Sequence, residues 1–206
     1  MLKIWGRTNS INVQKVLWCC AELKLPFDRV DAGGKFGVND TPEYLAMNPN
    51  GRVPTISDDG FILWESHAIV RYLSHRHGKG TLWPADEKAC ADADRWMEWY
   101  STTLWPPLQP VFWNLVRVEP AKRDVKLVEE SRNKVAGFLK MVEANLASRQ
   151  YMAGGAFTMG DIPMGVALHR WFLLPIERPD YPRLAAYYER LKQRPGFAQH
   201  CAAPLT

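Results

Sequence analysis

Short apolar and alternating segments fill the first part of the chain. The apolar segment LKIW (2–5) and the alternating segment FDRVDA (27–32) have the pattern of β-strands. Between them, NVQKVLWCCAELK (12–24) carries apolar residues at helical spacing, and one short helix is expected at 42–47 within a polar stretch. The pattern therefore predicts a strand, a helix, a second strand and a short helix, in that order.

A hairpin and another helix are predicted next. In VPTISDDGFILW (53–64), two apolar runs surround the dipeptide Asp59-Gly60, which supplies the positive φ angles of a tight hairpin turn. The segment SHAIVRYLSHRHG (66–78) has its apolar residues on one helical face and Gly78 as its stop signal. Strands and helices in this order predict one mixed sheet with helices packed on it.

The pattern changes after residue 78. The segment GKGTLWPADE contains two glycines and a proline, as a linker does, and no strand pattern follows it. Long amphipathic helices are predicted at 87–104, 124–148 and 183–193, and FTMGDIP (157–163) predicts a buried helix with Thr158 and Asp161 as its capping box. We therefore assign residues 1–78 to a small α/β domain, 79–86 to a linker and 87–206 to an all-helical domain.

Composition narrows the function classes. The 26 basic and 22 acidic residues give a net charge of +4 but form no basic stripe, which argues against nucleic-acid binding. The four cysteines, Cys19, Cys20, Cys90 and Cys201, have no metal-ligand spacing, so we expect no metal and a reducing, cytoplasmic location. No apolar segment has the length of a membrane span or the form of a signal peptide, so we expect no membrane partner.

Small polar residues gather where the first helix is expected to begin, in TNSIN (8–12). A helix start presents free backbone N–H groups and a partial positive charge, which stabilise an anion. A thiol placed there loses its proton more readily, and a hydroxyl that donates to the sulfur favours the thiolate further. The alternative is that Ser10 or Asn9 only caps the helix.

The segment NGRVPTI (50–56) has a proline at the start of a strand. A cis Val53–Pro54 bond would turn the backbone N–H and C=O of Val53 outward, toward an extended peptide. The alternative is a trans bond at the edge of the sheet, where a proline costs no ladder hydrogen bond.

The segment WESHAIV (64–70) joins the hairpin to the next helix. Ser66 is expected to be the N-cap, but Ile69 stands three residues later, so no acid completes a capping box. That position suits a ligand carboxylate, and Glu65 suits a ligand ammonium, as in the zwitterionic end of an amino acid. An ordinary cap beside an exposed acid is the alternative.

Taken in order, the motifs TNS, NPNGRVP, WESHAIVRYL and FTMGDI resemble those of the cytosolic glutathione transferases over essentially the whole chain. V-P followed about ten residues later by E-S is the most diagnostic, and the resemblance is greatest to bacterial serine-type members, theta-like or nu-like. It implies a thioredoxin-like α/β N-terminal domain, an all-α C-terminal domain, a homodimer and a cytoplasmic role in detoxification.

The resemblance also implies roles for individual residues. Ser10 matches the hydroxyl that hydrogen-bonds the sulfur of glutathione, the co-substrate. Thr8 and Asn9 compete with it as sulfur partners, and Asn12 stands where serine-type members often have proline, which leaves open which side chain contacts the sulfur. Cys19 and its neighbour lie too far into the helix to match a cysteine-type site.

The rest of the tripeptide would contact three further segments. Val53–Pro54 would pair with its cysteinyl part, and Glu65–Ser66 would hold the γ-glutamyl ammonium and carboxylate. Arg52 would reach the glycine carboxylate, and Lys35 is a second candidate for that end.

The implied reaction is attack of the glutathione thiolate on a small apolar electrophile. The electrophile would bind between the domains, against aromatic and apolar residues that include Tyr100, Leu104, Trp105 and Trp113. The alternative for each of these side chains is packing in the helical core. Alternative functions on the same site are glutathione-dependent peroxide or disulfide reduction, and ligand binding or assembly without turnover.

Overall fold

A computed structural model describes all of residues 1–206, and its N-terminal half is built on a four-stranded sheet of order β2-β1-β3-β4. β1 (Leu2–Trp5) runs parallel to β2 (Phe27–Val30) and antiparallel to β3 (Thr55–Asp58). β3 pairs antiparallel with β4 (Phe61–Trp64), so that Thr55 lies opposite Trp64 across the hairpin. The mixed sheet and the hairpin predicted from the sequence are confirmed.

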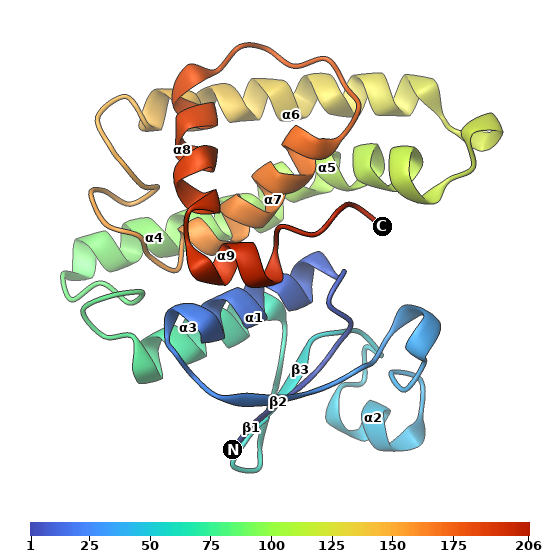
Figure 1. Cartoon of the computed structure of the whole chain (residues 1–206), viewed down its shortest axis with the longest axis vertical. Helices are drawn as coiled ribbons and strands as arrows, with labels where there is room; N and C mark the ends of the chain where they lie inside the picture. The colour runs from blue at the N-terminus through green and yellow to red at the C-terminus, as the bar shows by residue number, and fades with distance from the viewer.

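Helices separate the sheet from the other half of the molecule. α1 (Ile11–Glu22) and α3 (Ser66–His77) lie between the sheet and the helical half, whereas α2 (Pro42–Met47) lies to one side (Figure 1). A short 3₁₀ turn, Gly34–Phe36, precedes α2. The helix expected at 42–47 has the predicted bounds, and Gly78 follows α3 at its C-cap.

The second half is entirely helical. α4 (Glu87–Trp99) continues through a π-helical turn (Tyr100–Leu104) into α5 (Trp105–Phe112) and a second π-helical turn (Trp113–Arg117). The uninterrupted helix expected over 87–104 changes hydrogen-bonding pattern here because Pro106 and Pro107 have no N–H to donate to the preceding turn. The remaining helices are α6 (Val125–Asn145), α7 (Asp161–Leu173), α8 (Pro182–Lys192) and α9 (Pro195–His200).

None of the helices combines the length and the apolar character needed to cross a membrane.

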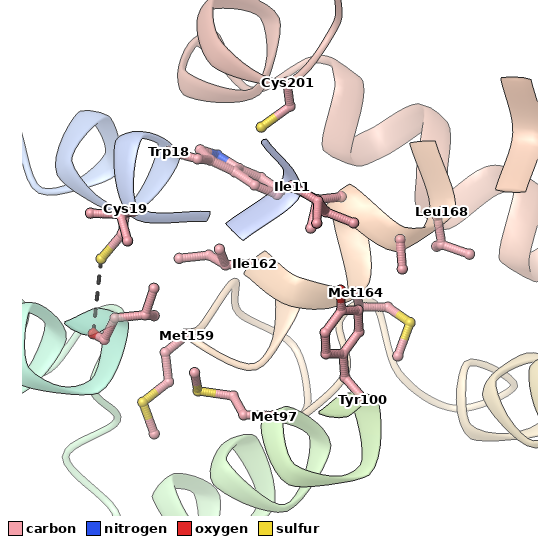
Figure 2. Close-up of a cluster of buried hydrophobic side chains, with 14 of the residues drawn as sticks. Ile11, Trp18, Cys19, Met97, Tyr100, Met159, Ile162, Met164, Leu168 and Cys201 are labelled. Atoms are coloured by element: carbon pink, nitrogen blue, oxygen red, sulfur yellow. Dashed lines mark hydrogen bonds between the residues drawn. The ribbon is translucent and has the colours of Figure 1, made fainter. Parts of the chain in front are cut away.

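One hydrophobic core extends through both halves, and α1 lies inside it. Figure 2 shows Ile11, Trp18 and Cys19 of the N-terminal half packed among residues of the helical half, including Ile162 and Met97. Because α1 is buried against the sheet side and the helical side together, its first turn is fixed relative to both.

Trp18 is the main side chain at this junction. Its ring lies so close to α7 and α9 that a Cβ atom on Gly165 would be 2.6 Å from it, and one on Gly196 would be 2.8 Å from it. The indole N–H donates to Glu22 at 2.8 Å, and Arg194 of the helical half binds Glu22 with N–O distances of 2.8 and 2.6 Å. These contacts join the two halves through apolar packing and a partly buried ion pair.

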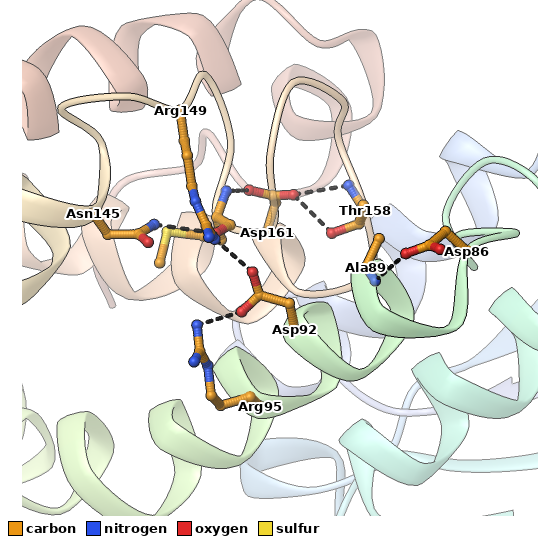
Figure 3. Close-up of polar contacts among 9 residues, drawn as sticks. Asp86, Ala89, Asp92, Arg95, Asn145, Arg149, Thr158 and Asp161 are labelled. Carbon is orange, nitrogen blue, oxygen red and sulfur yellow. Dashed lines mark hydrogen bonds and ion pairs between the residues drawn. The ribbon is translucent and has the colours of Figure 1, made fainter.

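The start of α7 differs from the expected capping box. The helix begins at Asp161 with Gly160 at its N-cap, so the acid occupies the first helical position instead of the third (Figure 3). The buried carboxylate accepts from the backbone N–H groups of Met152 and Thr158, both at 2.8 Å. It also accepts from the hydroxyls of Thr158, at 3.1 Å, and Tyr187, at 2.7 Å. Asp161 therefore ties the loop before α7 to α8.

Substitution of Asp161 by asparagine tests this network. The amide nitrogen cannot accept, so at least one buried donor loses its partner, and we expect the free energy of unfolding to fall by about 2 kcal/mol. Urea unfolding followed by circular dichroism measures the change.

Asp86→Asn is the matched control, because Asp86 caps α4 through the N–H of Ala89 and asparagine is an equally good N-cap. Equal unfolding free energies for the two variants would contradict the role given to Asp161.

Candidate functional site

The start of α1 opens into a cleft of about 340 Å³, called here the central cleft. Ser10 is the N-cap residue, has extended backbone angles (φ −84°, ψ 123°) and is only 7% exposed. Its hydroxyl makes no capping hydrogen bond, although the first-turn N–H groups are adjacent to it. The hydroxyl is therefore free to contact a ligand in the cleft.

The loop before Ser10 is held by β2 and α1. The N–H groups of Gly6 and Arg7 donate to the carbonyls of Val30 and Ala32 at 2.9 and 3.0 Å. A Cβ atom on Gly6 would lie 2.4 Å from the Val13 side chain, so only glycine fits this approach of loop to helix. The position of Ser10 is thus set by packing on both sides.

Polar and glycine residues form the wall of the central cleft opposite Ser10. The Val53–Pro54 peptide bond is cis, and Pro54 precedes the interior strand β3, so the proline is not on a sheet edge. The backbone N–H and C=O of Val53 make no hydrogen bond to other backbone groups. No aspartate or glutamate lines the central cleft, whose residues are Arg7, Ser10, Asn12, Gly33, Gly34, Asn39, Asn50, Gly51, Arg52 and Val53.

A second cleft, of about 380 Å³, lies at the start of α3 and shares Asn12 with the central cleft. We call it the lysine cleft, since Lys15, Glu65 and Ser66 line it. The expectation that Ser66 is the N-cap is corrected by one residue: Glu65 occupies the cap with φ +70°, and Ser66 begins the helix. A positive φ on a residue other than glycine is an unfavourable conformation of the kind found at ligand-binding positions.

Lys15 is the functional candidate that the sequence reasoning missed. It is 2% exposed, and its Nζ lies 3.0 Å from Asn12 Oδ1, 3.4 Å from Ser66 Oγ and 3.1 Å from His67 Nε2. Burial and, to a smaller extent, the Arg170 charge lower the pKa of Lys15 to about 7, while the Glu65 charge opposes this change. The only signal in the sequence was a single basic residue within a largely apolar helix.

His67 supports this placement of the lysine. Burial, then the charges of Lys15 and Arg71, lower the pKa of His67 to about 2. The imidazole is therefore neutral, and its Nε2 accepts from the Lys15 ammonium while Nδ1 carries the ring proton.

A third cleft, of about 450 Å³, lies between the two halves and is called here the interdomain cleft. It shares Arg7 and Gly34 with the central cleft. Trp113 and Arg117 of the helical half form one wall, and Lys35 and Phe36 form the other. Lys35, expected near the glycine end of a tripeptide, therefore lines the interdomain cleft, whereas Arg52 lines the central cleft.

The predicted aromatic and apolar contacts are divided among three environments. Trp113 is 55% exposed in the interdomain cleft. Tyr100 and Trp105 line the lysine cleft, where the buried hydroxyl of Tyr100 has no hydrogen-bond partner. Leu104 is 1% exposed and belongs to the hydrophobic core.

The neighbours of Ser10 differ from it in their surroundings. The side-chain amide of Asn9 donates to the hydroxyl of Thr206 at 2.8 Å, in the C-terminal tail. Thr8 is exposed and lines the interdomain cleft. Of the three polar residues before α1, only Ser10 lines the central cleft.

No cysteine lines any of the three clefts. Cys19, Cys20 and Cys201 are buried free thiols. Burial raises the pKa of Cys19 to about 12, and it also raises the pKa values of Cys20 and Cys201. These groups stay protonated at neutral pH and do not act as nucleophiles.

The chain matches two family models. The one described as glutathione S-transferase, N-terminal domain, matches residues 9–76, and the one described as glutathione S-transferase, C-terminal domain, matches residues 126–190.

Full-length relatives give the same result. The chain is 36% identical to glutathione S-transferase GstB of Escherichia coli strain K12, with 100% of both chains covered. It is 33% identical to glutathione S-transferase 3 of Zea mays, over 98% of this chain and 94% of that protein. Among solved structures, the theta class glutathione S-transferase from Xanthomonas axonopodis pv. citri, with glutathione bound, superposes with a TM-score of 0.96. That protein is 43% identical, with 100% of this chain and 99% of that chain covered.

Proposed function

This chain belongs to the glutathione S-transferase family, and from that premise we propose that it joins the thiolate of glutathione to small electrophiles with an apolar body. The observation that carries the proposal is the free hydroxyl of Ser10, at the start of α1 and on the wall of the central cleft. A thiolate beside this hydroxyl gains one hydrogen bond and the partial positive charge of the helix start.

We assign the polar groups of the central cleft and the lysine cleft to successive parts of the tripeptide. Glu65 and Ser66 would receive the zwitterionic γ-glutamyl end in the lysine cleft. The free backbone groups of Val53 would pair with the cysteinyl residue in the central cleft, as an extended peptide pairs with a strand. Arg52, which lines the same cleft, would take the glycine carboxylate. Asn12 joins the two clefts and lies between these ends.

We propose that Lys15 is a positioning residue for its neighbours Asn12 and Ser66. Its ammonium donates hydrogen bonds to Asn12 and Ser66 and so orients both side chains. It also adds positive charge next to the proposed position of the ligand carboxylate. Glu65, which lines the same cleft, would form an ion pair with the ligand ammonium and so offset the positive charge of Lys15.

The reaction follows from these contacts. The bound thiol releases its proton to solvent, and the sulfur lone pair attacks an electrophilic centre held in the adjoining interdomain cleft. Binding both reactants in connected clefts makes the bimolecular step effectively unimolecular. Each unit by which the protein lowers the thiol pKa corresponds to about 1.4 kcal/mol of preference for the thiolate.

We propose that the chain forms a homodimer and acts in the cytoplasm. Large apolar side chains stay exposed on each half of the chain. Phe61 and Trp64, on the edge strand β4, are 51% and 36% exposed, and Met141 on α6 is 53% exposed. Contiguous patches of exposed apolar groups mark association surfaces, and the proposed dimer would cover these side chains. The free state of the four cysteines suits a reducing compartment.

Ser10→Ala tests the proposed thiolate contact. We expect the pKa of bound glutathione to rise by roughly one unit, because one hydrogen bond to the thiolate is lost. Titration of the ultraviolet thiolate absorbance of the complex measures this pKa. Asn9→Ala and Thr8→Val are matched controls, and an unchanged pKa in Ser10→Ala together with a raised pKa in either control would move the role to that residue.

The lowered pKa of Lys15 predicts that the affinity for glutathione depends on pH. The ammonium is charged below its pKa of about 7 and neutral above it, so carboxylate binding weakens as pH rises through that value. We expect the affinity for S-methylglutathione, which has no titrating thiol, to fall about tenfold between about pH 6 and pH 8.5, since a charge-assisted contact contributes roughly 1.5 kcal/mol. Calorimetric titration of the wild type and of Lys15→Met measures it, and an equally steep pH dependence in Lys15→Met would refute the assignment.

The dimer is tested by the mass in solution. Light scattering coupled to size-exclusion chromatography is expected to give twice the chain mass of 23.6 kDa. A mass equal to one chain at micromolar concentration would contradict it.

A further inference from the structure

The interdomain cleft carries an excess of positive charge. Arg7, Lys35 and Arg117 line it, and no aspartate or glutamate does. None of the three cations forms an ion pair within the chain, in contrast to Arg194, which binds Glu22 at the domain junction. The positive charges of this cleft are therefore left without a counterion of the chain.

The same cations act on one another. Burial lowers the pKa of Arg7, and the neighbouring charge of Arg117 lowers it further. Burial, together with the charges of Arg117 and Arg7, lowers the pKa of Arg170 to about 10, while Tyr100 opposes this change. The Arg170 guanidinium lies 3.6 Å from the centroid of the Phe112 ring and has no carboxylate partner. An anion in the interdomain cleft would relieve this mutual repulsion.

The remaining walls of the interdomain cleft are aromatic. Phe36 is 41% exposed and Trp113 is 55% exposed, and both line the cleft. Lys35 lies over the Phe36 ring, with its Nζ 5.1 Å from the ring centroid. A cleft with two open aromatic surfaces and three cations fits a ligand with a flat apolar body and an acidic substituent.

Glutathione itself does not account for all of this charge. Its single free glycine carboxylate is assigned above to Arg52, which lines the central cleft but not the interdomain cleft. Arg117 belongs to the helical half and reaches the interdomain cleft from the wall opposite Lys35, and Arg52 does not line this cleft. Its charge is available to a second substrate.

We propose that the preferred electrophile of this transferase is a carboxylate, whose apolar body packs on Phe36 and Trp113 while its carboxylate group faces Arg117, Arg7 and Lys35. The interdomain cleft joins the central cleft at Arg7 and Gly34, so the reactive carbon of such a molecule can approach a sulfur held near Ser10. This assignment rests on the proposed transferase function and specifies the class of its second substrate.

A matched pair of aryl chlorides separates charge from shape. In 4-chloro-3-nitrobenzoate and its uncharged amide, 4-chloro-3-nitrobenzamide, the glutathione thiolate forms a C–S bond at the chlorine-bearing carbon. The C–Cl bond breaks, and chloride leaves with the bonding electron pair. Dividing each kcat/KM by the rate constant of the uncatalysed reaction removes the difference in intrinsic reactivity.

The wild type is expected to prefer the benzoate by about tenfold after this correction, since a charged pair in a partly open cleft contributes modestly. Arg117→Gln is expected to lower the preference by about three- to tenfold, and raising the ionic strength is expected to lower it as well. Lys134→Gln is the matched control: it removes one positive charge from an exposed position on α6 that lines none of the three clefts, and the preference should not change.

Equal corrected rates for benzoate and benzamide in the wild type would overturn the proposal and leave the transferase function standing. The proposal would also be overturned if Arg117→Gln and Lys134→Gln reduced the preference for the benzoate equally, because the preference would then come from the net charge of the protein. If the wild type conjugates neither compound nor the neutral 1-chloro-2,4-dinitrobenzene, the transferase function itself fails.

Discussion

Burial of α1 on both of its sides is the constraint on which the rest of the structure depends. Nine of its 12 residues are buried, and Trp18 lies against α7 and α9 so closely that Gly165 and Gly196 admit no side chain there. A helix held by the sheet on one side and by the helical half on the other cannot shift its first turn independently. The hydroxyl of Ser10 therefore lies at a fixed place, on the wall of a cleft, and its spare hydrogen-bonding capacity is left to a ligand.

The same packing determines how charge is distributed around the site. Because α1 is pressed against the helical half, Lys15 is enclosed beside Tyr100, with its Nζ 4.3 Å from the ring centroid, and Arg170 approaches from α7. On the other side of Ser10, Arg7 and Arg117 come from different halves to one cleft. The proposed thiolate thus lies between two groups of cations, which suits a reaction whose co-substrate carries negative charge on sulfur and carboxylates.

Local patterns predicted most of the secondary structure because each element carries its own signal. The alternation in residues 53–64 with Asp59-Gly60 gave the hairpin, and the helical spacing after Asn12 gave α1 within one residue of its start. The helices α5 and α9 were not predicted, because each has proline in its first turn. Proline is tolerated at that position of a helix, but in a sequence it also indicates the end of a helix. The observed N-caps, Glu65 and Gly160, differ from the expected Ser66 and Thr158 by one and two residues. At the start of α7, tertiary hydrogen bonds to Asp161, such as the one from Tyr187, decide where the helix begins.

The site could be predicted only in part. Residues proposed to act through backbone position or a helix start, such as Ser10, Val53 and Ser66, stand in motifs with recognisable spacing. Lys15 and Arg117 carry no such signal, since the roles proposed for them depend on side chains of the other half of the chain: Tyr100 lies beside Lys15, and Arg7 and Lys35 line the cleft with Arg117. The most direct test of the central claim is a crystal structure of the chain with bound glutathione. The account predicts the glutathione sulfur within about 3.5 Å of Ser10 Oγ, with the cysteinyl backbone paired to Val53. A sulfur that contacts Asn9 or Thr8 instead, or a tripeptide bound outside the central cleft, would contradict it.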